Sequence, residues 1–213
     1  MGASVARGTR ERILEVAETF FGERGYNGTR LHHIAERVGV QKASLFHYFP
    51  SKEELYRVVL EQSVGDTERT ITGALESSGT PLERACHLVE SWVDLAVAHP
   101  QRVKILLRQS LGDAPPGYRT PDTERLLGLV VGFLTEGQEA NVFPPVDALA
   151  TVLGIVGMVA FFFTSAPVLA PSWCGDPSSA EAVERVKRHV TDVMRRCLAG
   201  GGEAGASRRP AVA

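Results

Sequence analysis

The chain is poor in cysteine, and the few cysteines that it has are scattered. There are three, Cys86, Cys174 and Cys197, and no two of them form a CxxC pair. An odd number of widely spaced cysteines excludes a disulfide framework and is typical of a protein from a reducing compartment. The first residues also lack the continuous apolar segment of a secretory signal. We therefore expect free thiols and a cytoplasmic location.

Sequence patterns that accompany the common enzyme chemistries are absent as well. The chain has no GxSxG, no P-loop, no dinucleotide-binding glycine pattern and no HExxH or paired ExxH motif. His32 and His33 are adjacent, so their side chains point about 100° apart on a helix, and no further ligand is suitably spaced for a metal site. We expect a protein that is not an enzyme and that needs neither a cofactor nor a metal.

No large excess of either charge is present, which excludes a protein that coats nucleic acid indiscriminately. The net charge is −2, but the charges are unevenly distributed. Residues 1–60 contain nine Lys and Arg against seven Asp and Glu, whereas the remainder contains fourteen against eighteen. The difference, +2 against −4, is a mild bias in the direction that a DNA-binding N-terminal part requires.

Apolar residues recur every three or four positions through nearly the whole chain, and no alternating strand pattern is present. This spacing predicts an all-α fold of about nine helices. Thr9 is a suitable cap for a first helix that Gly25 ends, and a second helix over residues 31–38 is followed by Gly39. A third helix is expected over residues 42–49.

Capping boxes mark the starts of later helices. In this motif the N-cap hydroxyl accepts a hydrogen bond from the amide three residues on, and the side chain of that residue binds back to the cap. The pairs that fit the motif are Ser51 with Glu54, Thr80 with Glu83, and Ser178 with Glu181.

Three parts are expected along the chain. With 44% hydrophobic residues, the chain can bury a substantial core. Residues 1–52 form a first domain, in which residues 1–8 are expected to be disordered, and residues 53–199 form a larger helical domain. Residues 200–213 have almost nothing to bury and predict a disordered tail.

Residues 31–49 predict two short helices joined by a tight glycine turn and braced by the first helix, which is the plan of a helix-turn-helix. On the second of these helices Leu45 and Phe49 point toward the brace, whereas Ala43, Ser44 and His47 point outward. Small, hydrogen-bonding side chains allow close approach to base edges in a major groove. The alternative is an ordinary helical hairpin, which occurs in many proteins that never bind DNA.

The segment from Thr9 to Leu55 carries a family resemblance. The stretches "ILEVAETFFGERGY", "IAERVGV" and "LFHYFPSKEEL" occur in this order, and this segment, about a quarter of the chain, resembles the N-terminal domain of TetR/AcrR family transcriptional regulators. The resemblance implies a three-helix DNA-binding domain followed by a larger helical domain for effector binding and dimerisation.

The matching positions imply a set of contacts to double-stranded DNA. Lys42 and Lys52 begin two helices, where anions are favoured, and Arg30 precedes a third; all three could meet phosphates. The expected DNA-binding residues are Arg30, Gln41, Lys42, Ala43, Ser44, Phe46, His47, Tyr48 and Lys52.

Three of these positions depart from the family pattern. Arg30 stands where Thr or Ser is usual, and Thr29 is an alternative cap for the second helix. Gln41 replaces a common serine cap, and Phe46 replaces a tyrosine that often donates to a phosphate. The operator sequence is therefore not inferable.

Residues 148–170 form an uncharged run of 23 residues, long enough to cross a bilayer of ~30 Å. No Lys or Arg occurs between Arg125 and Arg185, so the run lacks the basic flank of a membrane helix, and Pro167 is expected to end the helix near residue 165. A helix that is apolar on all sides is otherwise typical of deep burial. We expect burial against the subunit core on one side and a second copy on the other, with no membrane insertion.

A homodimer interface is expected from two helices of each subunit. Gly154 and Gly157 would let a partner helix approach closely, and the apolar stripe of the last helix would pack beside them. Alternatively, the glycines only relieve crowding within one subunit. The residues assigned to the interface are Gly154, Gly157, Val183, Val186, Val190 and Met194.

The size of the second domain also predicts a pocket for a small apolar or aromatic effector. Five apolar side chains and one arginine are its candidate lining, although each could be ordinary core or surface: Trp92, Arg108, Phe133, Met158, Phe161 and Phe162. The resulting hypothesis is a homodimeric repressor that an effector releases from a palindromic operator, with the fourth helix as lever and Gly65 as hinge. A DNA-binding regulator controlled by a protein partner, without a pocket, is the alternative.

Overall fold

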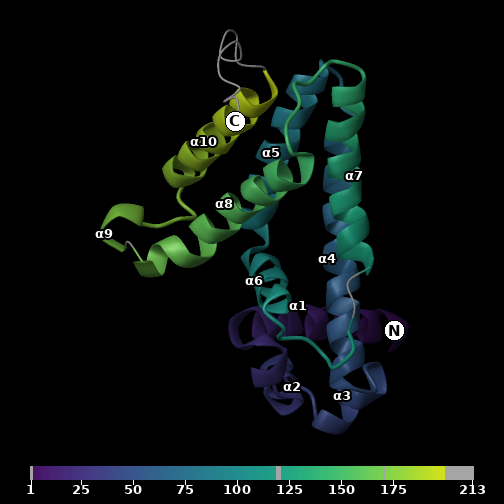
Figure 1. Cartoon of the computed structure of the whole chain (residues 1–213). Helices are drawn as coiled ribbons and strands as arrows, with labels where there is room; N and C mark the ends of the chain where they lie inside the picture. The colour runs from purple at the N-terminus through teal and green to yellow at the C-terminus, as the bar shows by residue number, and fades with distance from the viewer. Residues whose placement is uncertain (1, 119–120, 170, 200–213) are drawn as a thin grey trace, which may run out of the picture.

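The computed structural model describes residues 2–118, 121–169 and 171–199, which contain helices and no strands (Figure 1). The all-α prediction is confirmed, with ten helical segments in the described residues, of which α9 is a single turn. The segments are α1 (Gly2–Gly28), α2 (Leu31–Val38), α3 (Lys42–Tyr48), α4 (Lys52–Leu75), α5 (Pro81–Ala98), α6 (Pro100–Ser110), α7 (Pro121–Glu139), α8 (Ala148–Leu169), α9 (Pro171–Cys174) and α10 (Ala180–Leu198). The expected tail, residues 200–213, lies outside the described residues.

Helix α1 differs from its predicted limits at both ends. It begins at Gly2 in the structure, and the disorder expected for residues 1–8 stays a prediction. Residues 3–7 contain no glycine or proline. Extending an existing helix fixes the backbone of only one residue for each hydrogen bond gained, which favours the longer helix. Gly25, the expected stop, has φ 73° and ψ 177° and interrupts the helix, which resumes for a short turn to Gly28.

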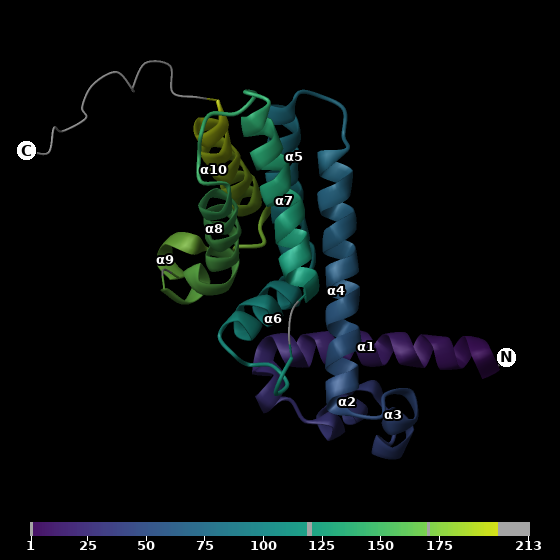
Figure 2. The ribbon, with the colours of Figure 1, turned by 45° about the vertical axis from the view of Figure 1, so that its right-hand side comes forward.

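Two apolar cores lie at opposite ends of α4. The first core belongs to what we call the head, which consists of α1, α2, α3 and the first turns of α4; Ile13, Ile34, Leu45 and Leu55 are fully buried there. The second core joins the far end of α4 to α5, α7, α8 and α10, which we call the C-terminal bundle. Figure 2 shows α4 running from the head, where α1 crosses it, up to this bundle.

Helix α6 contributes to both cores. Ile105, which is 2% exposed, packs into the head, whereas Val103, two residues earlier, packs into the C-terminal bundle. The head core therefore draws on residues well beyond position 52, and the division at residue 52 stays a prediction.

Helix α8 is long and apolar enough to cross a membrane, by length and composition, with a mean hydropathy of 2.2 over its most apolar window. Asp147 caps it by accepting from the amide of Ala150 at 2.9 Å. The predicted end near residue 165 is wrong, because α8 continues to Leu169 with Pro167 inside its last turn. A proline there removes only one late hydrogen bond. One side of α8 packs into the bundle, and the other is exposed.

Helix α10 begins one residue later than its predicted capping box implied. Ser179, not Ser178, is the N-cap and accepts from the amide of Ala182 at 3.3 Å. Ser178 instead donates its hydroxyl to Asp176 at 2.6 Å. Among the described side chains, Cys86 and Cys197 are free thiols, as expected.

Candidate nucleic-acid interface

The turn between α2 and α3 is built on Gly39. Its φ of 81° and ψ of 32° place it in the left-handed region, which L side chains rarely adopt. Its amide donates to the carbonyl oxygen atoms of Ala35 at 3.0 Å and Glu36 at 3.1 Å, and the amide of Val40 donates to Ala35 at 2.9 Å. These bonds end α2 and hold α3 at a fixed angle to it, as the sequence predicted.

Helix α3 presents the two faces that its sequence predicts. Leu45 is completely buried, and Phe49, directly after the helix, is 1% exposed. Ala43, Ser44 and His47 are exposed on the opposite side. The prediction of a helix with an apolar inner face and a small, polar outer face is therefore confirmed as geometry.

The cations expected near phosphates come from the starts of three successive helices, α2, α3 and α4. Arg30 and Lys42 are exposed, and the ammonium of Lys42 lies 5.7 Å from the ring centre of Phe46. The ammonium of Lys52 lies 4.4 Å from the ring centre of Tyr26. Partial burial lowers the pKa of Lys52, and the nearby charge of Asp113 opposes this shift. Lys52 thus sits more tightly against the protein than Lys42.

The helix starts supply further donors. Gln41 precedes α3 and makes no side-chain capping bond, and Arg30 precedes α2 likewise, so the first amides of both helices have no side-chain cap. Ser51 caps α4 by accepting from Glu54 at 3.0 Å, as predicted. Amides left without a cap at a helix start can donate to phosphate oxygen atoms. Gln41, Phe46 and His47 are exposed beside them and Tyr48 is half-buried.

Thr29 does not cap α2, which corrects the alternative raised by the sequence. Its side chain is buried, and its hydroxyl lies 2.7 Å from the carbonyl oxygen of Gly25 and 3.0 Å from that of Phe20. In a continuous helix the carbonyl of Gly25 would accept from the Thr29 amide; that amide bonds to Tyr26 at 3.3 Å, and the Thr29 hydroxyl donates to Gly25 instead. Thr29 therefore fastens the start of α2 to the end of α1.

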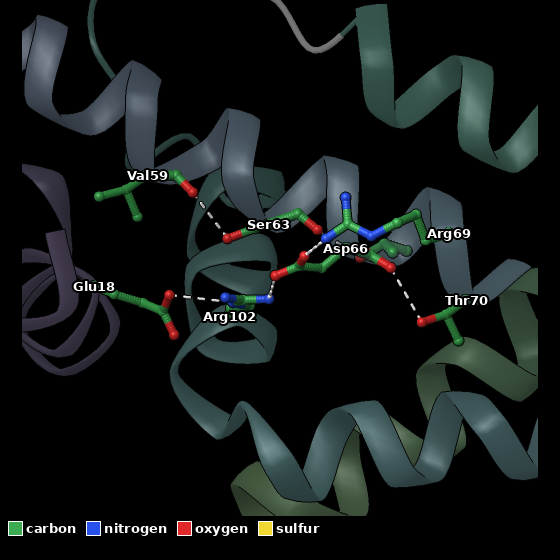
Figure 3. Close-up of polar contacts among 8 residues, drawn as sticks. Glu18, Val59, Ser63, Asp66, Arg69, Thr70 and Arg102 are labelled. Carbon is green, nitrogen blue, oxygen red and sulfur yellow. Dashed lines mark hydrogen bonds and ion pairs between the residues drawn. The ribbon is translucent and has the colours of Figure 1, made fainter. Parts of the chain in front are cut away.

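A charged bridge joins the head to α4 and α6 (Figure 3). Arg102 of α6 donates from Nε to Glu18 of α1 at 3.1 Å and from its terminal nitrogen to Asp66 of α4. Its side chain is only 16% exposed. Arg69 also pairs with Asp66 but is 75% exposed. Arg102 thus connects three helices at the junction of the head and the C-terminal bundle, next to Gly65, which α4 passes through without a break.

The structure separates the six candidate effector residues. Trp92, Phe133, Met158 and Phe162 are partly buried against the core of the C-terminal bundle. Phe161 is 59% exposed on the outside of α8 because α8 turns its neighbours Val159 and Ala160 inward. The guanidinium of Arg108 instead donates to the carbonyl oxygen atoms of Gly22 and Glu23 of α1. Phe161 and Arg108 are therefore withdrawn from the candidate pocket.

The residues assigned to a dimer interface are likewise divided. Gly154 and Gly157 are exposed on α8, and an added Cβ would meet no atom within 4 Å, so they do not relieve crowding within this subunit. The stripe of α10 is different: Val186, Val190 and Met194 are at most 7% exposed and pack into the chain's own core. Their assignment to an interface is corrected, because α5 already covers that stripe. Val183 is half-buried beside it.

One region that contacts the head, the stretch after α6, could not be recognised from the sequence. Asp113 and Tyr118 come from this stretch and reach the head, where Tyr118 stacks edge-on against Tyr56 with ring centres 6.0 Å apart. No local pattern marks these residues, because their partners are more than sixty residues away in the sequence.

A glycine-turn helix pair with an exposed polar second helix, mounted on a larger helical bundle, has the architecture of a helix-turn-helix protein. Comparison with known proteins is more specific. Residues 13–59 match the profile "Bacterial regulatory proteins, tetR family", and residues 81–194, more than half of the chain, match "Tetracyclin repressor-like, C-terminal domain". The chain belongs to the TetR family of bacterial transcriptional regulators.

Individual relatives agree with this membership. The HTH-type transcriptional regulator RutR of Escherichia coli (strain K12) is 31% identical over 141 residues, which are 63% of this chain and 66% of RutR. The TetR family regulator PfmR from Thermus thermophilus superposes with a TM-score of 0.70 at 25% identity, over 92% of this chain and 98% of PfmR. AibR, solved in complex with isovaleryl coenzyme A and operator DNA, shares the fold, with a TM-score of 0.70 at 19% identity over 87% of this chain and 97% of AibR.

Proposed function

We propose that the chain is a ligand-responsive transcriptional repressor that acts in the cytoplasm and binds a palindromic operator as a homodimer. The observation that carries the proposal is the outer face of α3, where Ala43, Ser44 and His47 are exposed between the cations Lys42 and Lys52. Small polar side chains contact base edges and provide sequence specificity. Cations beside them bind the phosphate backbone and provide affinity.

A second copy is required because α3 spans only seven residues and reads few bases. Two heads must match half-sites about 34 Å apart. The exposed side of α8 supports a dimer there: Leu149, Leu153 and Phe161 are 47%, 51% and 59% exposed, and Gly154 and Gly157 leave open space between them. An apolar strip with a backbone that can be approached closely is suited to a matching helix.

A small apolar effector is supported by the side chains gathered in the C-terminal bundle. Trp92, Phe133, Met158 and Phe162 border one core, and the indole Nε1 of Trp92 is buried without a hydrogen-bond partner among the described residues. A buried donor without an acceptor is costly, and an oxygen of a bound ligand would remove that cost. The proposed effector is therefore mainly apolar with at least one acceptor atom.

Release follows from linkage between the two sites. An effector that prefers a state with the heads displaced must weaken operator binding by the same factor by which DNA weakens effector binding. Helix α4 runs from the head into the C-terminal bundle and Arg102 ties it to α1 and α6, so a change in the bundle is passed to the head.

The test of base reading begins with selection of bound sequences from a random DNA pool. His47→Ala and Ser44→Ala are each expected to change the preference at one position per half-site by about 1–3 kcal/mol. His189→Ala, an exposed histidine on α10, is the matched control and should leave the preference unchanged. A uniform loss over all sequences would remove Ser44 and His47 from base reading.

The dimer is tested by measuring the oligomeric state of Leu153→Glu by sedimentation, with Val142→Glu as the matched control. Both side chains are about half exposed, at 51% and 50%, but only Leu153 lies on the α8 strip. We expect the first variant to dissociate at micromolar concentration and the second to stay dimeric. A wild-type chain that is monomeric at that concentration would contradict the dimer. A dimer that no apolar compound releases from its operator would favour control by a protein partner.

A further inference from the structure

Helix α1 is interrupted at Gly25, shortly before its end at Gly28. The left-handed φ of Gly25 interrupts the helix, and the carbonyls of the turn before the break lose the amides that would follow them in a continuous helix. Gly22 and Glu23 belong to this turn. The amide of Asn27, which would bind the Glu23 carbonyl in a continuous helix, bonds to the side chain of Asp113 instead.

Arg108 of α6 supplies the missing donors. Its Nε donates to the carbonyl oxygen of Gly22 at 3.1 Å and its terminal nitrogen to that of Glu23 at 2.8 Å, across 85 or more residues of sequence. A guanidinium can serve two acceptors at once because its donors lie in one plane. Its positive charge is also favourable at a helix C-terminus. Arg108 of α6 therefore caps this turn of α1.

Asp113 supplies the missing acceptor on the other side of the break. Its Oδ1 accepts from both the backbone amide and the side-chain nitrogen of Asn27, each at 3.0 Å. Its Oδ2 lies 3.9 Å from Arg108, so the two groups also attract each other. A Cβ on Gly25 would lie 1.7 Å from Asp113, so the glycine is required for this approach as well as for its φ.

The capped corner leads directly into the DNA-facing elements. Thr29 is bonded to the carbonyl of Gly25, and Arg30 and α2 follow at once. Tyr26, inside the corner, carries the ammonium of Lys52 on its ring at 4.4 Å. The position of the corner thus sets the position of two cations that are expected to meet phosphates.

We propose that Arg108 and Asp113 form a cap through which α6 and the stretch after it fix the Gly25–Thr29 corner and so position Arg30 and Lys52 on the DNA backbone. Both are positioning residues, which act through the corner and do not touch DNA. A displacement of α6 withdraws the cap and loosens the corner. The second half of this inference rests on the proposed function, and the first half does not.

The cap itself is tested by amide hydrogen exchange, which needs no DNA. Arg108→Ala and Asp113→Ala should each speed exchange of the amides from Tyr26 to Arg30 about tenfold, since each variant removes partly exposed hydrogen bonds made by a charged group. Amides of the α5 core should not change, which shows that the variants remain folded. Lys104→Ala, which removes a cation from the same helix but no described contact to α1, is the matched control. Unchanged exchange in both cap variants would overturn the cap.

The positioning role is tested on the selected operator with the same variants. Arg108→Ala should weaken operator affinity about tenfold, and Arg108→Lys, which keeps the charge but not the paired donors, should lie between it and the wild type. Asp113→Ala combined with Asn27→Ala should cost less than the sum of the single changes. Wild-type affinity in Arg108→Ala, with a loosened corner, would overturn the positioning role. A wild type that selects no DNA sequence would refute the proposed function, and the exchange comparison would still decide whether the cap exists.

Discussion

Replacing Lys52 by alanine is expected to change the salt dependence of operator binding by a calculable amount. The ammonium of Lys52 is held against Tyr26 at the start of α4, the helix that follows α3. One phosphate contact per subunit makes two per dimer, and each contact contributes about 0.9 to the slope of log affinity against log salt. The slope should therefore flatten by about 1.8.

The same arithmetic predicts how the variant differs from the wild type as salt rises. Between about 50 and 200 mM salt, a slope difference of about 1.8 corresponds to about 1.1 log units, so the affinity deficit of Lys52→Ala should shrink roughly twelvefold over this range. The deficit should be the same for specific and non-specific DNA, because phosphates carry no sequence information.

The assay is a titration of labelled operator by fluorescence anisotropy at four or more salt concentrations. Lys187→Ala is the matched control: it removes a lysine from α10 that pairs with Asp94 at 2.6 Å, away from the head. Its slope should equal that of the wild type. An unchanged slope in Lys52→Ala would refute the phosphate contact, and an equal change in both variants would assign the effect to net charge.

Three further changes test how the fold is held, each by thermal or denaturant unfolding. Arg102→Ala leaves Glu18 and Asp66 without their shared cation and should cost about 2 kcal/mol, between the values for buried and exposed pairs, whereas Arg69→Ala, at 75% exposure, should cost less than about 0.5 kcal/mol. Thr29→Val keeps the shape of the side chain but removes the buried hydroxyl that donates to Gly25, and should lower the free energy of unfolding by about 1–2 kcal/mol. The control Thr19→Val, at an exposed position on α1, should leave the free energy of unfolding nearly unchanged. Gly137→Ala places a Cβ 2.2 Å from the buried ring of Phe143 and should cost about 1–3 kcal/mol, whereas Gly132→Ala, with open space on the same helix, should be neutral or stabilising by up to about 1 kcal/mol. Equal effects within any of these pairs would contradict the stated cause.

Features governed by neighbouring residues could be predicted from the sequence. Both bonds of the predicted box at the start of α5 are present: Thr80 accepts from the amide of Glu83 at 3.2 Å, and Glu83 accepts from the amide of Thr80 at 2.7 Å. Gly39 and the two faces of α3 also follow their patterns. In each case the signal and its physical cause lie within one or two helical turns, so periodicity and capping chemistry are sufficient.

Features that depend on distant partners could not be predicted in the same way. The stripe of α10, including Val190, shows that one face is buried, but periodicity does not say whether α5 or a second subunit buries it. Arg108 binds backbone carbonyls, which leave no trace in residue type at Gly22 or Glu23. The contact of Asp113 with the head could not be predicted, because Asp113 lies between helices, outside any periodic segment.

The position of α6 explains why the two ends of the molecule cannot change independently. Ile105 fills the head core and Val103 the core of the C-terminal bundle, so a shift of α6 along or about its axis disturbs the packing of both. Close-packed cores resist gradual deformation and respond by moving between discrete arrangements. Under the proposed function, an effector that enlarges the C-terminal core therefore has two outcomes open to it: it leaves α6 in place and has no effect on DNA binding, or it displaces α6 and removes Ile105, Arg102 and Arg108 from the head together. Because all three contacts lie on one helix, their loss is concerted, and a single effector can change operator affinity by more than any one of these contacts contributes.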